Sequence, residues 1–467
     1  MSRRIRVLLM AAALLMPARA WAHAHLKRSD PAAGSQLVGS PQFIRLWFSE
    51  QPDLSLTLAS LQDAAGRTFR LARVEQETSG RMGIRLRVLD TLPQGHYTLS
   101  WRTAGSDGHP SSGKFAFDVG AAAQISGGIT PPPRLSPDSI ESSRSGALGA
   151  NGSQASAQPA DLDAASSIGN SIARAFLFLA LLALIGTVSF NLVVLRRANA
   201  VPIELKRSMA QRAAALGAVS ALLLLIISLV RLYLESRMMS AMPDMPGMEE
   251  MSIREMVMHT GWGFAFQLQV AAAISAVFGF AMASRRLRGG WSLAAISALV
   301  LAITPALSGH AAASPRFRSL MILADWLHVL GGAGWLGSLL SVMLIGVPVA
   351  LTLESADRWA SVASLVNAFS SLALICAAVV VASGVFASWV HLEHVTALWE
   401  TTYGRVLLVK LIFVAITFAV GAYNFKRVQP QLSNQVGTER LRRSAALELT
   451  TAFLILLVTG LLTGVST

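Results

Sequence analysis

The sequence has only one cysteine, Cys376, among its 467 residues. A lone cysteine excludes a disulfide framework and any CxxC metal or redox pair within the chain. Because Cys376 lies in the apolar run LALICAAVVVAS, we interpret it as a small core residue.

Charged residues are also scarce. They make up 14% of the chain, whereas hydrophobic residues make up 53% and the mean hydropathy is +0.51. This composition excludes an ordinary soluble protein of this length and indicates that most of the chain lies in lipid. Acidic residues are scarcer than basic ones: the chain has 26 Asp and Glu against 39 Lys and Arg, which gives a net charge of +13. The basic residues lie in short loops between apolar runs, so they predict membrane orientation and not a nucleic-acid partner.

The first 22 residues have the three parts of a signal peptide. Residues 3–6 give a basic start, residues 7–16 are an apolar run too short to span a bilayer, and AWA at 20–22 is a small-x-small cleavage site. Cleavage there would begin the mature chain with His23. Its α-amine and imidazole together would form a chelate for copper.

Residues 23–120 alternate apolar and polar side chains with period two. Turn-forming stretches such as SDPAAGS, TLPQG and SDGHPSSG separate the alternating segments. This pattern predicts a compact antiparallel sandwich or barrel of immunoglobulin-like size. Residues 121–165 are rich in Ala, Gly, Ser, Pro and Gln and predict a flexible tether that buries no core.

Residues 166–467 contain eight apolar runs long enough to cross a bilayer and predict an all-α polytopic bundle of eight transmembrane helices. The runs lie at about 170–195, 211–233, 262–283, 291–309, 319–346, 365–390, 404–424 and 445–465. The loops after the first, third and seventh runs carry most of the Lys and Arg residues. They predict that these loops face the cytoplasm and that the N-terminal domain lies outside.

This topology places all five histidines of the membrane half at its outer side. They are His259, His310, His328, His391 and His394. Asp325 and His328 are three residues apart and share one helix face, where ionisable side chains need partners. We interpret them, with His259 and His310, as a metal or proton site open to the outside; alternatively, Asp325 only orients His328 within the bundle. The GGAGWLG segment that follows favours close approach of a neighbouring helix.

The second external loop holds eight of the 16 methionines within residues 238–258. Because the loop is polar and broken by prolines, core packing does not explain this density. Four of the methionines are spaced by three residues: Met242, Met245, Met248 and Met251. Thioether sulfur prefers Cu(I), so we interpret the loop as a copper-receiving segment. An interfacial amphipathic segment that uses Met as a flexible apolar residue is the alternative.

Asp107 and His109 lie in the SDGHP turn of the β domain. Together with the amine and ring of His23 they would supply the nitrogen and oxygen ligands that Cu(II) prefers in a tetragonal site. A competing site would use the free N-terminal tripeptide, with His25 in third place.

The N-terminal part resembles the copper-resistance CopC family. The segments that carry the resemblance are HAHLKRSDPAAGSQL, FIRLWFSE and YTLSWRTAGSDGHPSSGKFAFDV, which cover nearly all of residues 23–119. The resemblance implies a small Greek-key β-barrel in which His23, Asp107 and His109 take the Cu(II) positions. Met82 is the only methionine of this domain, so the resemblance to methionine-rich members does not extend to a Cu(I) site.

The membrane half is similar to the CopD family in GWGFAFQLQ, ADWLHVLGGAGWLGSLL, ETTYGRVLLVKLIFVAITFAVGAYN and RRSAALELTTAFLILLVTGLLT. This resemblance implies copper passage across a bacterial inner membrane. We therefore expect a multi-pass protein of the cytoplasmic membrane with its N-terminal domain in the periplasm, acting as a transporter and not as an enzyme.

The leading hypothesis is copper import. The tethered domain captures periplasmic Cu(II), the Met-rich loop and outer histidines receive Cu(I), and the bundle passes it inward. Expected partners are copper ions, the lipid bilayer and periplasmic copper carriers. Two alternatives stay open: a membrane redox protein with haem or quinone at the outer histidines, and a copper buffer or sensor without flux.

Overall fold

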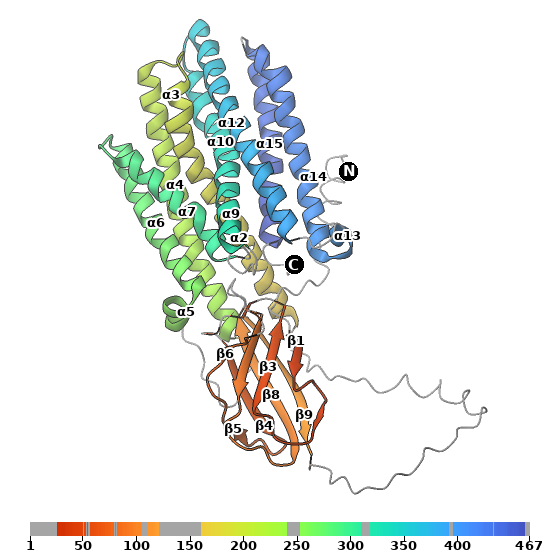
Figure 1. The fold of residues 1–467 in the computed structure, drawn as a ribbon. Coiled ribbons are helices and arrows are strands. Elements are labelled where there is room, and N and C mark those ends of the chain that lie inside the picture. Colours follow the sequence, from red (N-terminus) through yellow and green to blue (C-terminus); the bar gives the residue numbers. More distant parts are fainter. Residues whose placement is uncertain are drawn as a thin grey trace, which may run out of the picture.

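A β sandwich is followed by a bundle of long helices (Figure 1). The computed structural model describes residues 26–462 except 50, 53, 55–56, 79, 81, 105–109, 121–159, 241–252, 310–316, 392–395 and 433. This arrangement confirms the predicted fold class of an all-β domain and an all-α membrane region. The predicted signal peptide, and the tether as far as residue 159, lie outside the described residues; residues 160–165 belong to the first helix.

Two mostly antiparallel sheets form the sandwich. The first contains β1 (Leu26–Asp30), β3 (Phe43–Phe48), β7 (Gly83–Arg87) and β6 (Glu75–Gln76), and the second contains β2 (Gln36–Leu37), β9 (Pro110–Val119), β8 (Gly95–Ala104), β4 (Leu58–Asp63) and β5 (Thr68–Phe69), each in that spatial order. In β3, Ile44, Leu46 and Phe48 are buried and the residues between them only partly so. This alternation follows from the period of two along a strand and directs one face of each sheet into a shared core.

The helical region runs from α2 to α15. Its elements are α2 (Ala160–Ser189), η1 (Phe190–Val194), α3 (Leu195–Arg197), α4 (Ile203–Ser240), α5 (Ile253–His259), α6 (Gly261–Ser284), α7 (Gly290–Leu307), α9 (Arg318–Gly332), η2 (Ala333–Gly337), α10 (Ser338–Ser341), η3 (Val342–Gly346), α11 (Val347–Ala350), α12 (Ser355–His391), α13 (Ala397–Glu400), α14 (Thr402–Tyr423), η4 (Asn424–Val428), η5 (Gln429–Gln431) and α15 (Gln435–Leu462). Figure 1 shows the sandwich beside the end of the bundle that carries α5 and α13.

Seven helical stretches among the described residues are long and apolar enough to cross a membrane. They are Gly169–Arg197, Ile203–Arg237, Gly261–Ser284, Gly290–Leu307, Arg318–Ala350, Asp357–Val390 and Gly404–Gln431. The predicted count of eight is not confirmed. The eighth run lies in α15, which has the charged segment TERLRR in its first turns, contains Glu448 and is described only to Leu462.

Four segments of the bundle are π-helical: η1, η2, η3 and η4. Each continues a longer helix with a wider turn, a feature that is rare in α-helices and frequent at functional sites. The sequence pattern did not predict these segments, because one extra residue in a turn leaves the apolar periodicity almost unchanged.

Glycine allows α2 and η2 to touch along their backbones. A Cβ at Gly337 would collide with the carbonyl oxygen of Leu182 and lie 2.9 Å from the Cα of Gly186. The small residues of GGAGWLG therefore permit the close approach that the sequence predicts. This contact lies within the main core of the bundle, where Trp335 and Leu336 are also buried.

Candidate functional site

The copper ligands predicted for the sandwich lie outside the described residues. His23 precedes β1, and both Asp107 and His109 belong to the connection between β8 and β9. The structure does not test whether these three side chains come together. It does place the strands that flank them.

The flanking strands meet at one end of the sandwich. Leu26, at the start of β1, is in register with Phe48, whose ring lies 5.0 Å from that of Trp101 in the opposite sheet. Trp101 is three residues before the end of β8, where Ala104 pairs with Pro110. The chain therefore enters β1 and turns from β8 into β9 at the same end. In Figure 1 this end faces the helices.

The predicted outer residues of the bundle are only partly described. Met242, Met245, Met248 and Met251 lie outside the described residues, as does His310. His259 is the last residue of α5 and its side chain is exposed. The Thr260 hydroxyl that follows accepts a hydrogen bond from the Gly263 N–H over 2.8 Å and caps α6.

Asp325 and His328 lie on α9 and are both partly buried, as the helical spacing predicts. Lys410 of α14 interacts electrostatically with both residues. The Asp325 carboxyl therefore has a cationic partner from another helix, which offsets the cost of placing a charge in the membrane region.

His328 is held by a serine of α12. Its Nδ1 lies 3.0 Å from Ser383 Oγ, and that hydroxyl donates to the Val379 carbonyl oxygen over 2.6 Å. Because a serine has one O–H to donate, Oγ accepts from His328 and Nδ1 carries the proton. The ring also makes a hydrogen bond with the backbone of Val380 on the same helix, α12, as Ser383.

Glycines on α12, α9 and η2 allow these helices to pack closely around His328 and Cys376. A Cβ at Gly384 of α12 would lie 3.4 Å from His328 Cε1. A Cβ at Gly331 of α9 would lie 3.0 Å from the carbonyl oxygen of Cys376, and a Cβ at Gly334 of the following η2 would lie 2.8 Å from the Sγ of Cys376. Gly334 is six residues beyond His328, so the thiol lies about 9 Å further along the helix axis.

Met321 adds a third soft donor that our sequence reasoning missed. It precedes Asp325 by four residues and His328 by seven, which places all three side chains on one face of α9. Met321 is 2% exposed and packs with Phe386 and Ala387 of α12. The helical spacing of Met321 from Asp325 and His328 was the feature of the sequence that could have identified it.

The α9–α12 contact thus carries thioether, imidazole and thiol groups in succession, from Met321 through His328 to Cys376. Within the described residues, no three His, Cys, Asp or Glu side chains come together as a metal site. Sulfur and imidazole donors suit Cu(I).

A second polar group lies deeper in the bundle at Glu448 of α15, which is 2% exposed. Its Oε1 accepts a hydrogen bond from the Trp335 indole over 3.0 Å, and its Oε2 accepts one from Asn424 Nδ2 over 3.1 Å. Trp335 belongs to η2 and Asn424 to η4, so two π-helical segments supply the donors. The carboxyl therefore joins three helical stretches.

Replacing Glu448 by leucine is expected to destabilise the bundle. Both donors would lose their partner, at a cost of about 1–3 kcal/mol for each buried group. Glu448→Gln keeps an acceptor of the same shape and should lose less. Thermal unfolding of the purified protein in detergent checks this order, and equal stability of the two variants would contradict it.

Three protein families match parts of this chain. The family described as CopC domain matches residues 26–120, the Copper resistance protein D-like, N-terminal domain matches residues 164–317, and Copper resistance protein D matches residues 363–462. Together they cover the sandwich and most of the helical region.

Individual proteins are similar over the same parts. The copper transport protein CutJ of Bacillus subtilis (strain 168) is 24% identical over 430 residues, which are 91% of this chain and 72% of that protein. Copper resistance protein C of Pseudomonas syringae pv. tomato is 34% identical over 124 residues, which are 26% of this chain and 98% of that protein. The crystal structure of CopC from Methylosinus trichosporium OB3b is 25% identical and covers 21% of this chain and 93% of its own, with a TM-score of 0.20.

Proposed function

Because the chain belongs to the copper-resistance CopC and CopD families, joined in one polypeptide, we propose that it captures copper outside the cytoplasmic membrane and passes it inward. The observation that carries the proposal is the row of donors from Met321 through His328 to Cys376 between α9 and α12. The name of the relative CutJ, a copper transport protein similar over 91% of this chain, supports it.

The proposed order of events begins at the sandwich. After removal of residues 1–22, His23 would bind Cu(II) together with Asp107 and His109. Residues 121–159 would act as a tether that keeps the loaded sandwich near the bundle and raises the local copper concentration there. The Met-rich loop, with His259 and His310, would then receive the ion as Cu(I).

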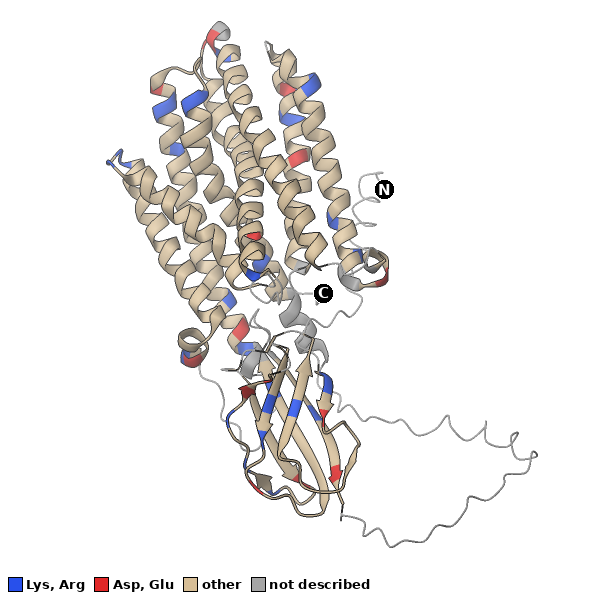
Figure 2. Ribbon diagram, viewed as in Figure 1, with Lys and Arg blue, Asp and Glu red and all other residues tan. Residues whose placement is uncertain are grey.

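The orientation of the bundle is part of the proposal. Basic residues favour the cytoplasmic side, and Figure 2 shows several Lys and Arg residues at the end of the bundle remote from the sandwich. Lys426 and Arg427, for example, lie in η4, and Arg196 and Arg197 lie in α3. The sandwich and the outer end of α9 would then face the periplasm.

Proteoliposomes test transport and its direction. Vesicles that contain the full chain enclose a Cu(I)-specific chromogenic chelator, and Cu(I) is added outside with ascorbate. We expect the colour to form faster than in protein-free vesicles. Equal rates of colour formation would contradict transport. If colour forms only when copper is enclosed and the chelator is outside, the protein carries copper outward and import is wrong.

Capture is tested by copper titration of the full chain. The double variant D107A/H109A is expected to bind Cu(II) at least about tenfold more weakly, because even outer-shell partners of metal ligands change affinity about 10–100-fold. The control is His96→Ala, since the exposed His96 bonds Asp118 over 2.8 Å and has no predicted copper role. Unchanged affinity in the double variant would refute the ligand assignment.

A further inference from the structure

Glu448 lies beside the inner end of the row of donors between α9 and α12, and the proposed copper route does not use it. A Cβ at Gly334 would lie 2.8 Å from Cys376 Sγ, and the next residue, Trp335, donates its indole proton to Glu448 Oε1 over 3.0 Å. Two successive residues of η2 therefore connect the thiol to the carboxyl. The carboxyl itself makes no hydrogen bond to a donor of the row within the described part of the chain.

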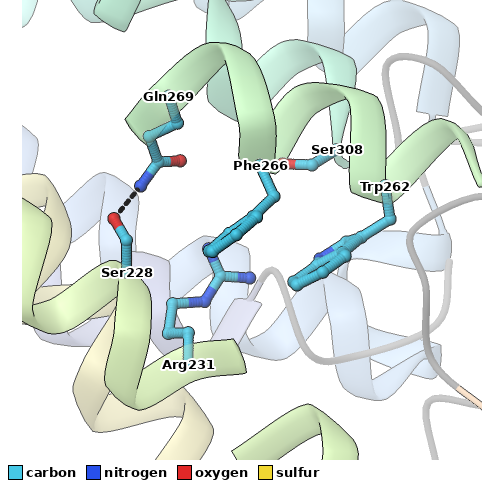
Figure 3. Close-up of a pocket in the computed structure, with 6 residues that line it drawn as sticks. All are labelled: Ser228, Arg231, Trp262, Phe266, Gln269 and Ser308. Atoms are coloured by element: carbon cyan, nitrogen blue, oxygen red, sulfur yellow. Dashed lines mark hydrogen bonds between the residues drawn. The ribbon is translucent and has the colours of Figure 1, made fainter. Parts of the chain in front are cut away.

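The Glu448 carboxyl also has no cationic partner within the described residues. Its interactions there are the hydrogen bonds from Trp335 and Asn424. A buried carboxylate without a cation is costly, so such a group takes up a proton unless a cation comes near. Glu235 of α4, which is also 2% exposed, differs because it interacts electrostatically with Arg231. Figure 3 shows Arg231 on the wall of a small hollow.

The charged and titratable side chains on the elements around Glu448 do not reach its carboxyl. α15 packs against α2, α10, α14, η4 and η5. Together with α15, these elements carry Asp161, Asp163, Arg174, Tyr403, Arg405, Lys410, Tyr423, Lys426, Arg427, Glu439, Arg440, Arg442 and Arg443.

The position of each of these side chains explains why it does not reach. Those of η4 and α15, and Tyr423 at the end of α14, are exposed. Arg174 packs at the level of Gly460, about 18 Å from Glu448 along α15. Lys410 precedes Asn424 by 14 residues, which is about 21 Å along its helix. The remaining residues precede Arg174 or Lys410 and lie further away.

Asn424 of η4 can pair with the carboxyl in two ways. Its Nδ2 donates to Glu448 Oε2 over 3.1 Å, which suits an ionised carboxylate because that group only accepts. Asn424 Oδ1 is buried and makes no hydrogen bond within the described part of the chain. Half a turn of the amide group would bring Oδ1 to Oε2, where it would accept the proton of the neutral acid. The pair therefore suits both protonation states of Glu448.

Asn424 is close to the basic end of the bundle. Lys426 and Arg427 follow it after two and three residues in η4, and both are exposed. The proposed orientation places this end in the cytoplasm. Asn424 would then lie within about one helical turn of cytoplasmic water, which can supply a proton.

We propose that Glu448 binds a proton from the cytoplasm and that this proton releases Cu(I) from the inner end of the row. The inference rests on the proposed copper route. An ionised Glu448 attracts a Cu(I) ion at the Cys376 thiol. When one proton forms an O–H bond at Glu448, the negative charge disappears and the ion leaves for the cytoplasm. The carboxyl returns its proton to the cytoplasm when the next ion arrives, and no electron moves.

Competitive Cu(I) titration of the full chain in nanodiscs, between about pH 6 and pH 8, tests the proposal. At the higher pH the wild type is expected to bind Cu(I) about tenfold or more tighter than E448Q, and at the lower pH the two should agree. E448D keeps an acid and should keep the pH dependence. The control is E439Q, which makes the same change at an exposed position of α15 and should match the wild type.

The two variants of Glu448 separate proton binding from a structural role. If Glu448 only holds the helices together, E448Q should resemble the wild type more closely than E448D does, because glutamine keeps the length and shape of the side chain. Equal pH dependence of Cu(I) affinity in E448Q and the wild type would overturn the proposal. This result does not depend on flux, whereas a lack of flux in proteoliposomes would contradict the proposed function.

Labelling of the wild type covers the case in which E448Q does not fold. Dicyclohexylcarbodiimide adds to protonated carboxyl groups in apolar surroundings, and mass spectrometry of peptides locates the adduct. Glu448 should be labelled, and Cu(I) should reduce its labelling about tenfold. Glu235, with Arg231 as its partner, should stay unlabelled. Absence of label at Glu448, or labelling that Cu(I) does not change, would overturn the proposal.

Discussion

The His328→Ala variant is expected to lose at least about nine-tenths of the copper flux into proteoliposomes. The imidazole is the middle donor of the row between α9 and α12, and its Nδ1 lies against Ser383 of α12. Removing it leaves about 20 Å of helix between the level of Met321 and that of the Cys376 thiol, beside Gly334, without a soft donor. The control is His96→Ala, a histidine of the sandwich that bonds Asp118.

Ser383→Ala gives a finer test of the same site. The serine keeps the proton on His328 Nδ1, and partners of this kind change metal affinity or activity by about 10–100-fold. The matched control on the same helix is Ser370→Ala, whose hydroxyl only donates to the Val366 carbonyl oxygen over 2.8 Å. If S383A and S370A transport copper equally fast, Ser383 does not determine which ring nitrogen of His328 carries the proton.

Much of the fold could be predicted from the sequence because its patterns are local. The period-two alternation in residues 23–120 predicts strands, and the apolar runs predict eight spanning helices, of which the described residues contain seven. The relation of Asp325 to His328 is equally local, since a helix always brings residues three apart onto one face.

The partners of these residues could not be predicted, because they come from distant parts of the chain. Ser383 is 55 residues from His328, and Trp335 is 113 residues from Glu448. No periodicity connects such positions.

Replacing Gly337 by valine is expected to have the largest effect on folding. A side chain there meets the Leu182 carbonyl and the Gly186 Cα, both of which are backbone atoms that no rotamer change can move away. Overpacking costs about 1–3 kcal/mol where side chains can yield. We therefore expect a cost above this range and a bundle in which α2 and η2 separate.

The consequences of Gly337→Val should extend to the polar groups of the bundle. Gly337 ends η2, the segment that also carries Trp335, so moving η2 outward would break the indole bond to Glu448 and shift α9 with His328. Gly332→Val is the matched control five residues earlier, because a Cβ there meets no atom within 4 Å. We expect G332V to give a monodisperse gel-filtration peak and normal copper flux. We expect G337V to aggregate and to lose its copper flux. A folded and active G337V would show that the two backbones are not in contact in the membrane.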